Sequence, residues 1–328
     1  MKWKRRAAGF LAILAGTLVG AMPASSAAPG DSVSVAEPAI PRPDLTGYVQ
    51  VRETLRRDVA TTTLNRVRIG AEGKLRGPFS YKIQLEAQAA SAGVGIAAVA
   101  LRDAWVRWSP PELRVTAGQM DTPYSREWIM STAEIETPDR SIVSEALAPR
   151  GDIGAVGIWR PEEHLALTGG AFNGDGQNAT SNRDSTTLLL GRLEVIPLVD
   201  VSLAAEIATL GSDSTRYGFT AGIERGRVEL WGEFLAQSHA GADSQDEGWY
   251  GLLLVKTLPG LRFVARQEQL HRPGLPPERA SDHGTTLGIL YDLPGDRVRI
   301  LADYVRRTSG PDDRLNEAIL LQLQARFF

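Results

Sequence analysis

The sequence predicts an all-β protein, a transmembrane antiparallel up-and-down β-barrel of sixteen strands. From about Leu45 onward, apolar and polar residues alternate with a period of two, which places them on opposite faces of a strand. The connections between these segments are alternately short and long, as in barrels of the bacterial outer membrane. No apolar run after Met22 approaches the ~20 residues that a spanning helix needs, so strands would have to cross the membrane.

Residues 1–27 have the pattern of a secretory signal peptide. Four basic residues precede an apolar run over residues 7–22, and the small residues Ser25 and Ala27 precede the expected cleavage site. A retained membrane anchor is the alternative, which the shortness of the run disfavours. Residues 28–43 contain four prolines and no periodicity, so we expect an extended periplasmic lead-in segment.

Residues 44–328 are expected to form the barrel. Tyr81 and Ile83, for example, share one face of a segment whose other face carries Lys82 and Gln84. The expected strands are residues 44–55, 62–73, 78–89, 98–108, 112–120, 149–160, 163–173, 184–196, 199–210, 214–224, 226–238, 246–257, 260–271, 282–292, 295–307 and 315–328. Most of them reach the ~9–11 residues that a tilted strand needs to cross a bilayer. Their even number places both termini on the short-turn side, the periplasmic one.

A secreted soluble β-sandwich or propeller would also show alternation. Three features weigh against it. The segments exceed the about five or six residues usual in soluble sheets, and no propeller-like repeat of ~40 residues is present. The polar faces also carry charge densely while the apolar faces are nearly free of it. Lipid outside and water inside a barrel explain both faces, but a sandwich-like surface protein that acts in binding or adhesion remains the alternative.

Several stretches resemble one family of bacterial outer-membrane channels, the phosphate-selective porin O and P family. The stretches are residues 64–75, 101–108, 115–124, 140–143, 150–154 and 171–176. The most specific part is Gly118-Gln119 followed by Thr122-Pro123. The resemblance implies a sixteen-stranded, trimeric barrel that admits small anions and folds a long third extracellular loop into its lumen.

Residues 121–148 form the longest connection, and they join the fifth and sixth expected strands. A long loop without its own core usually has a functional placement or is disordered. Folded inward, this loop would be the constriction; the alternative is a solvated loop that caps the barrel or packs against a trimer neighbour. Its candidate charged residues are Arg126, Glu127, Glu134, Glu136, Asp139 and Arg140, with Asp121, Glu145 and the following Arg150 beside them.

If the polar faces line water, they bring bases and acids into the lumen in nearly equal numbers. The bases are Arg52, Arg66, Arg68, Lys82, Arg107, Arg114, Arg192, Arg262, Arg266, Arg299 and Arg326, and the acids are Glu72, Glu86, Asp103, Glu194, Glu206, Glu229, Glu233, Glu268 and Asp303. A low-dielectric wall focuses such charges onto the water column. We expect Arg66, Arg68, Lys82, Arg107 and Arg114 to form a stripe that faces anions. Mutual neutralisation in ion pairs is the alternative for each of them.

After residue 27 the chain has three lysines, Lys74, Lys82 and Lys256, so no ladder of lysines can line the pore. The sequence therefore predicts a porin for passive diffusion of small hydrophilic solutes and ions. A preference for anions such as phosphate is left open, because the mixed lumen favours general passage. The guanidinium fork of arginine can nevertheless hold phosphate or carboxylate through paired hydrogen bonds.

No enzymatic chemistry is predicted. Nucleophile-elbow and phosphate-loop motifs are absent from the sequence, cysteine is missing and the four histidines lack metal-ligand spacing, so we expect no catalytic residue, metal or cofactor. The net charge of −3 disfavours nucleic acid as a partner. The expected partners are membrane lipid and lipopolysaccharide, small solutes, two further copies in a homotrimer, and the outer-membrane insertion machinery, which would bind Phe328.

Overall fold

The computed structural model describes residues 41–88, 98–179, 181–182, 185–242, 244–276, 280–308 and 317–327. The expected signal peptide, residues 28–40 of the lead-in and Phe328 lie outside the described residues, so the predictions made for them stay predictions. No helix within the described part of the chain is long and apolar enough to cross a membrane.

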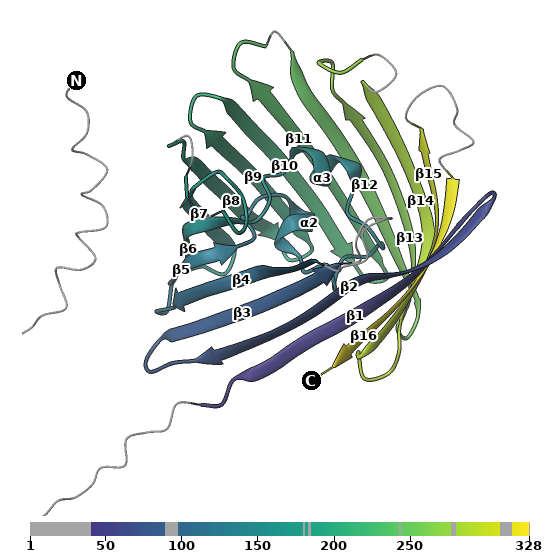
Figure 1. Cartoon of the computed structure of the whole chain (residues 1–328), viewed down its shortest axis with the longest axis horizontal. Helices are drawn as coiled ribbons and strands as arrows, with labels where there is room; N and C mark the ends of the chain where they lie inside the picture. The colour runs from purple at the N-terminus through teal and green to yellow at the C-terminus, as the bar shows by residue number, and fades with distance from the viewer. Residues whose placement is uncertain are drawn as a thin grey trace, which may run out of the picture. The chain divides into compact units, whose positions relative to one another are not determined.

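Sixteen antiparallel strands close into one barrel in which every strand pairs with its neighbours in sequence and β1 pairs with β16 (Figure 1). The strands are β1 (Asp44–Arg56), β2 (Val59–Lys74), β3 (Phe79–Gln88), β4 (Ala98–Trp108), β5 (Leu113–Met120), β6 (Asp152–Glu162), β7 (Leu165–Phe172), β8 (Leu188–Leu198), β9 (Val201–Leu210), β10 (Ser214–Arg225), β11 (Val228–His239), β12 (Gln245–Leu258), β13 (Leu261–His271), β14 (Ser281–Asp292), β15 (Val298–Thr308) and β16 (Glu317–Phe327). The predicted fold class and strand number are confirmed, and the sandwich-like alternative is excluded.

Several predicted strand boundaries differ from the structure, most by one or two residues and the starts of β2, β6, β8 and β15 by three or four. Strand β2 begins at Val59 rather than residue 62, because residues 59–61 pair with the end of β1 and leave a turn of only Arg57 and Asp58. Strand β6 begins at Asp152 rather than residue 149. The carbonyl of Pro149 accepts a hydrogen bond from the Thr122 hydroxyl at 2.7 Å, which keeps that residue in the preceding loop.

The two rims of the barrel differ in their connections. The rim that carries both strand termini Asp44 and Phe327 has connections of two to five residues, and we call it the short-turn rim. The other, the long-loop rim, carries residues 121–151 as its third connection. This loop contains two short helices that the sequence did not predict, α2 (Arg126–Ile129) and α3 (Ile142–Leu147). Both helices lie inside the barrel (Figure 1).

The barrel exposes large apolar side chains on its outer face and buries polar ones on its inner face. Along β11, Leu230 is 49% exposed, whereas Glu233, of opposite phase, is 3% exposed. On β14, Leu287 is 52% exposed and Thr286 is 1% exposed. This distribution is the reverse of that in a soluble protein and matches a sheet whose outer face contacts lipid.

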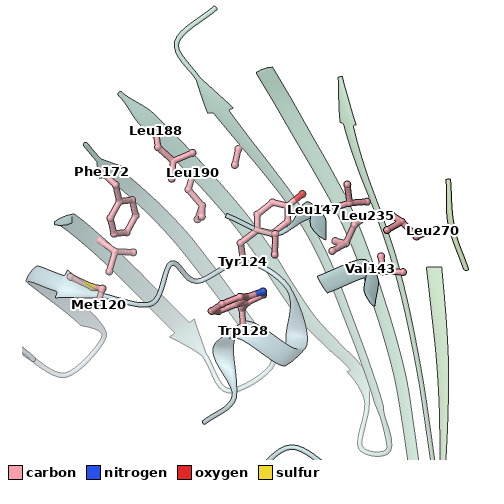
Figure 2. Close-up of a cluster of buried hydrophobic side chains, with 13 residues drawn as sticks. Met120, Tyr124, Trp128, Val143, Leu147, Phe172, Leu188, Leu190, Leu235 and Leu270 are labelled. Carbon is pink, nitrogen blue, oxygen red and sulfur yellow. The ribbon is translucent and has the colours of Figure 1, made fainter. Parts of the chain in front are cut away.

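The hydrophobic core lies between the loop and the inner wall. Tyr124, Trp128, Val143 and Leu147 of the loop face wall residues such as Leu235 (Figure 2). A second buried apolar cluster on the inner face comprises Tyr250, Leu252, Leu254, Val264, Leu290 and Leu301. The inner face of β6–β8 and β11–β15 is therefore mixed rather than wholly polar as expected, because apolar inner residues there pack against the loop or one another instead of contacting water.

Candidate pore and its charged lining

Two glutamates of the inner wall hold the start of helix α2. Glu206 on β9 accepts a hydrogen bond from the backbone N–H of Ser125 at 2.9 Å, and Glu233 on β11 accepts one from the N–H of Arg126 at 2.7 Å. The first N–H groups of a helix have no partner inside the helix. The wall carboxylates provide that partner and fix this end of the loop.

A third wall glutamate holds helix α3. Glu268 on β13 accepts a hydrogen bond from the N–H of Ile142 at 2.8 Å, while Glu127 of the loop accepts one from the N–H of Ser141 at 2.6 Å. Arg266 lies 3.2 Å from Glu127 and 3.5 Å from Glu268. Burial raises the pKa of Glu127, and Arg266 opposes the shift. This buried network joins the loop to β13.

Arginines of the wall bind the remaining length of the loop. Arg299 on β15 and Arg326 on β16 both donate to the carbonyl oxygen of Ala133, at 3.0 and 2.7 Å. Arg52 on β1 forms an ion pair with Asp139 at 2.9 Å. These three arginines were expected to face water; the structure shows that their guanidinium groups position the loop.

The predicted loop residues have different environments. Arg126, Glu127, Glu136 and Asp139 are engaged in contacts that hold the loop, Glu134 is exposed, and Arg140 and Arg150 face a cavity. Arg126 forms an ion pair with Glu136 and lies over the ring of Trp231, 4.4 Å from its centroid. The charge of Arg126 is thus neutralised within the packed loop.

A cavity of about 430 Å³ lies between the loop and the wall formed by β2–β4. Its charged lining residues are Arg66, Arg68, Glu86, Arg102, Arg140, Glu145 and Arg150. Five guanidinium groups therefore face two carboxylates across this space. The cavity brings Arg66 and Arg68 of the predicted stripe together with Arg140 and Arg150 of the predicted constriction loop.

On each side of the cavity, two arginines share one carboxylate. On the wall, Glu86 contacts Arg68 directly and lies 3.3 Å from Arg66. On the loop, Glu145 lies 3.8 Å from both Arg140 and Arg150. Each group of three therefore keeps a surplus of one positive charge. The Arg150 side chain is 70% exposed, which makes it the most accessible charge of the loop group.

Arg102 lines the same cavity but was assigned to no face by the sequence. The β3–β4 register shifts at Gln84/Leu85, and this bulge turns Arg102 inward beside Asp103. Arg102 lies 2.5 Å from Asp121 and donates to Gln177 at 2.8 Å. A bulge adds a residue on one strand and reverses the phase of alternation locally. No signal in the alternation itself could have identified it.

The rest of the predicted stripe lies outside this cavity, on β3–β5. Lys82 forms an ion pair with Asp103 at 2.9 Å. Arg107 donates to the hydroxyl of Thr116 at 3.0 Å, and Arg114 is exposed near the beginning of β5 at the short-turn rim. The five stripe residues thus occupy one sector of the wall, but they do not form a single cluster.

Among the described residues, no three His, Asp or Glu side chains are grouped as metal ligands. The charged groups of this sector therefore offer hydrogen bonds and electrostatic attraction to a passing solute. Their arrangement suits diffusion of small hydrophilic molecules past the loop.

The family model described as phosphate-selective porin O and P matches residues 44–225, and no curated protein matches the sequence. Among solved structures, OmpT of Vibrio cholerae with loop L8 deleted aligns at 11% identity over 87% of this chain and 98% of its own, with a TM-score of 0.63.

Two further structures share the fold. The outer membrane channel DcaP of Acinetobacter baumannii aligns at 12% identity over 87% of this chain and 97% of its own, with a TM-score of 0.61. An anion-selective porin from Comamonas acidovorans aligns at 12% identity over 87% and 99%, with a TM-score of 0.60. Family and fold are those of a channel rather than of an enzyme. The chain belongs to the phosphate-selective porin O and P family and forms a passive diffusion channel in the bacterial outer membrane.

Proposed function

We propose that this porin favours small anions, and that they pass between the loop and the wall of β2–β4. The observation that supports it is the cavity of about 430 Å³ whose charged lining is five arginines and two glutamates. A low-dielectric wall strengthens the field of such a surplus in the water beside it. Anions would therefore be concentrated at the narrow part of the channel and cations depleted.

Binding at this place should be weak and brief. Arg68 and Arg140 are largely buried and already have carboxylate or carbonyl partners, so they contribute charge more than direct contacts. The exposed Arg150 is the group that can contact a solute. A channel conducts best when a site attracts the solute but releases it readily, and phosphate would be one of several anions admitted.

The other lumen charges support general passage. Lys256 pairs with Glu229 at 2.6 Å, and Asp292 pairs with Arg262 at 2.7 Å and with Arg299 at 2.6 Å. Such pairs leave little net field. We therefore expect a moderate anion preference superimposed on diffusion of small neutral solutes.

Residues 121–148 act as the constriction, and the long-loop rim faces the cell surface while both chain ends lie in the periplasm. Residues 1–27 are removed on export, residues 28–43 form the periplasmic lead-in, and Phe328 presents the C-terminus to the insertion machinery. The porin assembles as a homotrimer, as the OmpT of Vibrio cholerae does in its trimer form, with lipid and lipopolysaccharide around it.

Reversal potentials in planar bilayers test the proposal. In a KCl gradient the wild-type channel should be more permeable to chloride than to potassium. The preference should weaken at high salt, because screening shortens the range of the arginine field. Stepwise conductance with equal permeability to both ions would retain the diffusion channel and refute the anion preference.

A further inference from the structure

Another cavity lies beneath the loop, on the side of helix α2 that faces the short-turn rim. It has a volume of about 320 Å³ and is lined by β8–β11 and by helix α2. Glu194 and Trp231 line it and lie nearer the short-turn rim than Glu206 and Glu233, which hold the start of helix α2. The cavity therefore faces solutes that approach from the short-turn rim.

Small side chains hollow the wall at this place. Ser202 and Ala204 of β9 form the floor of the cavity between Glu194 on β8 and Trp231 on β11. The strand pairing places them there, since Ala204 lies opposite both Glu194 and Thr220. The resulting volume falls within the range of sites that bind small molecules, roughly 300–1,000 Å³.

The roof of the cavity is apolar although it borders the lumen. Ile129 at the end of helix α2 is 48% exposed, and Met130 lines the cavity beside it. The Trp231 ring packs against Gly222 and lies under the guanidinium group of Arg126, 4.4 Å from the ring centroid. That ring face is therefore occupied, and a second cation would have to bind elsewhere in the cavity. Ile129 and the part of the indole that borders the cavity can instead receive the apolar part of a solute.

The wall side of the cavity carries carboxylates that arginine neutralises only in part. Arg192 contacts Glu206 directly and lies 3.5 Å from Glu194, so one guanidinium group serves two carboxylates. The Glu194 side chain is 40% exposed. Glu224 also lines the cavity, is exposed, and forms no ion pair within the part of the chain that the structure describes. The other arginine of the lining is already paired within the loop, so a surplus of negative charge faces the cavity.

We infer that this cavity binds small organic ammonium ions, in which one cationic nitrogen is attached to an apolar body. The nitrogen donates to the Glu194 carboxylate and to the Ser202 hydroxyl, and the body lies against Ile129 and Trp231. Glu224, nearer the short-turn rim, attracts the cation toward the cavity. A charge-assisted hydrogen bond fixes the nitrogen, and burial of the body adds apolar contact. This site and the cavity beside β2–β4 lie in different sectors of the wall, so each can be tested without the other.

The chain provides a matched control on the other side of the barrel. Asp44 and Glu72 lie opposite each other on β1 and β2 at the short-turn rim, and both are exposed. The double variant Asp44→Asn/Glu72→Gln removes as much negative charge as Glu194→Gln/Glu224→Gln, at the same rim but outside the cavity. Reversal potentials in KCl report the anion preference separately, so failure of the ammonium site is distinguishable from failure of the anion preference.

The experiment titrates phenethylammonium chloride onto the full chain in planar bilayers at low salt and measures the concentration that halves the single-channel current. Wild type should be blocked about tenfold more strongly by phenethylammonium than by ethylammonium, which lacks the ring, or by phenylpropionate, which carries the opposite charge. Glu194→Gln/Glu224→Gln should raise the half-blocking concentration about tenfold, and Ile129→Ser about threefold. Asp44→Asn/Glu72→Gln should be blocked as the wild type is. Heat-modifiable migration in SDS gels verifies that each variant is folded.

Any of four results would refute the ammonium site. The first is the lack of block by phenethylammonium in the wild type. The second is an equal block by ethylammonium, which would leave the apolar roof without a role. The third is an equal block by phenylpropionate, which would leave the carboxylates without one. The fourth is the same half-blocking concentration for Glu194→Gln/Glu224→Gln and Asp44→Asn/Glu72→Gln, since it would assign the block to the lumen charge as a whole.

Discussion

Two sectors of the inner wall use the same kinds of side chain for different purposes. On β2–β4, Arg66 and Arg68 share Glu86 beside a cavity, so positive charge is left over. On β9–β13, Glu233 and Arg266 form hydrogen bonds with groups of the loop. Apolar residues fill the space between the loop and this part of the wall. The first sector has charge to act on solutes, while the second has charge that fixes the loop.

The comparison shows that an inward charge is not by itself a functional charge. The side chain of Arg266 is 2% exposed and that of Arg66 is 19% exposed, although both belong to strands with the same alternation. What separates them is the loop, which covers one sector and leaves the other beside a cavity. Substitutions in the two sectors should therefore change different observables.

The largest effect is expected from Glu233→Ala. This carboxylate accepts from the N–H of Arg126 at 2.7 Å and from the hydroxyls of Ser125 and Thr220 at 2.8 and 3.1 Å, and its loss leaves buried donors without partners. The free energy of unfolding in vesicles should fall by about 3–5 kcal/mol, and the loop should become open to proteases. The half-exposed Glu194 gives the control Glu194→Ala. An equal loss of unfolding free energy in both variants would contradict the role of Glu233 in holding the loop.

A smaller loss of stability is expected from Leu235→Ala. Leu235 is fully buried against the loop, so truncation leaves a cavity and should cost about 3 kcal/mol in guanidinium unfolding. Leu230 on the same strand is 49% exposed on the outer face. Leu230→Ala should cost roughly half as much, because lipid fills the space and no cavity remains. A larger cost for Leu230→Ala would reverse the assignment of the two faces.

Substitutions in the sector formed by β2–β4 should change ion selectivity rather than stability. Arg66→Gln/Arg68→Gln removes two positive charges and leaves Glu86, so the anion-to-cation permeability ratio should fall roughly tenfold at low salt. Reversal potentials measure it. The control Arg66→Gln/Glu86→Gln removes one charge of each sign and should change the ratio little; a ratio unaltered in both variants would exclude this wall from the selectivity mechanism.

The smallest effect is expected from Arg150→Gln. Its side chain is 70% exposed, so water and salt screen its charge and the permeability ratio should fall about twofold. The change should vanish at 1 M salt, where the screening length is about 3 Å. Arg262→Gln, outside the cavity and paired with Asp292, provides the comparison. A salt-independent loss would indicate a direct contact with the ion.

The alternation of residues was sufficient to predict the barrel, because the face that a strand residue occupies is a local property. It gave the sixteen strands, the outward direction of residues such as Ile83, and the long connection between the fifth and sixth strands. It could not give Arg102, because the β3–β4 bulge that turns it inward depends on pairing between strands. Nor could it show that Glu233 and Glu268 hold helix starts, since their partners lie about a hundred residues away.

Away from the β3–β4 bulge, the sequence alone therefore determined which residues face the lipid and which face the interior, since period two fixes that choice strand by strand. Only the tertiary structure decided what each interior residue meets. Residues 121–151 pack against one sector of the wall and leave a cavity at the other. Arg266 and Arg66 thereby acquire different roles. Long-range contacts with the loop exclude water from the guanidinium group of Arg266, whereas the guanidinium group of Arg66 stays partly accessible to water.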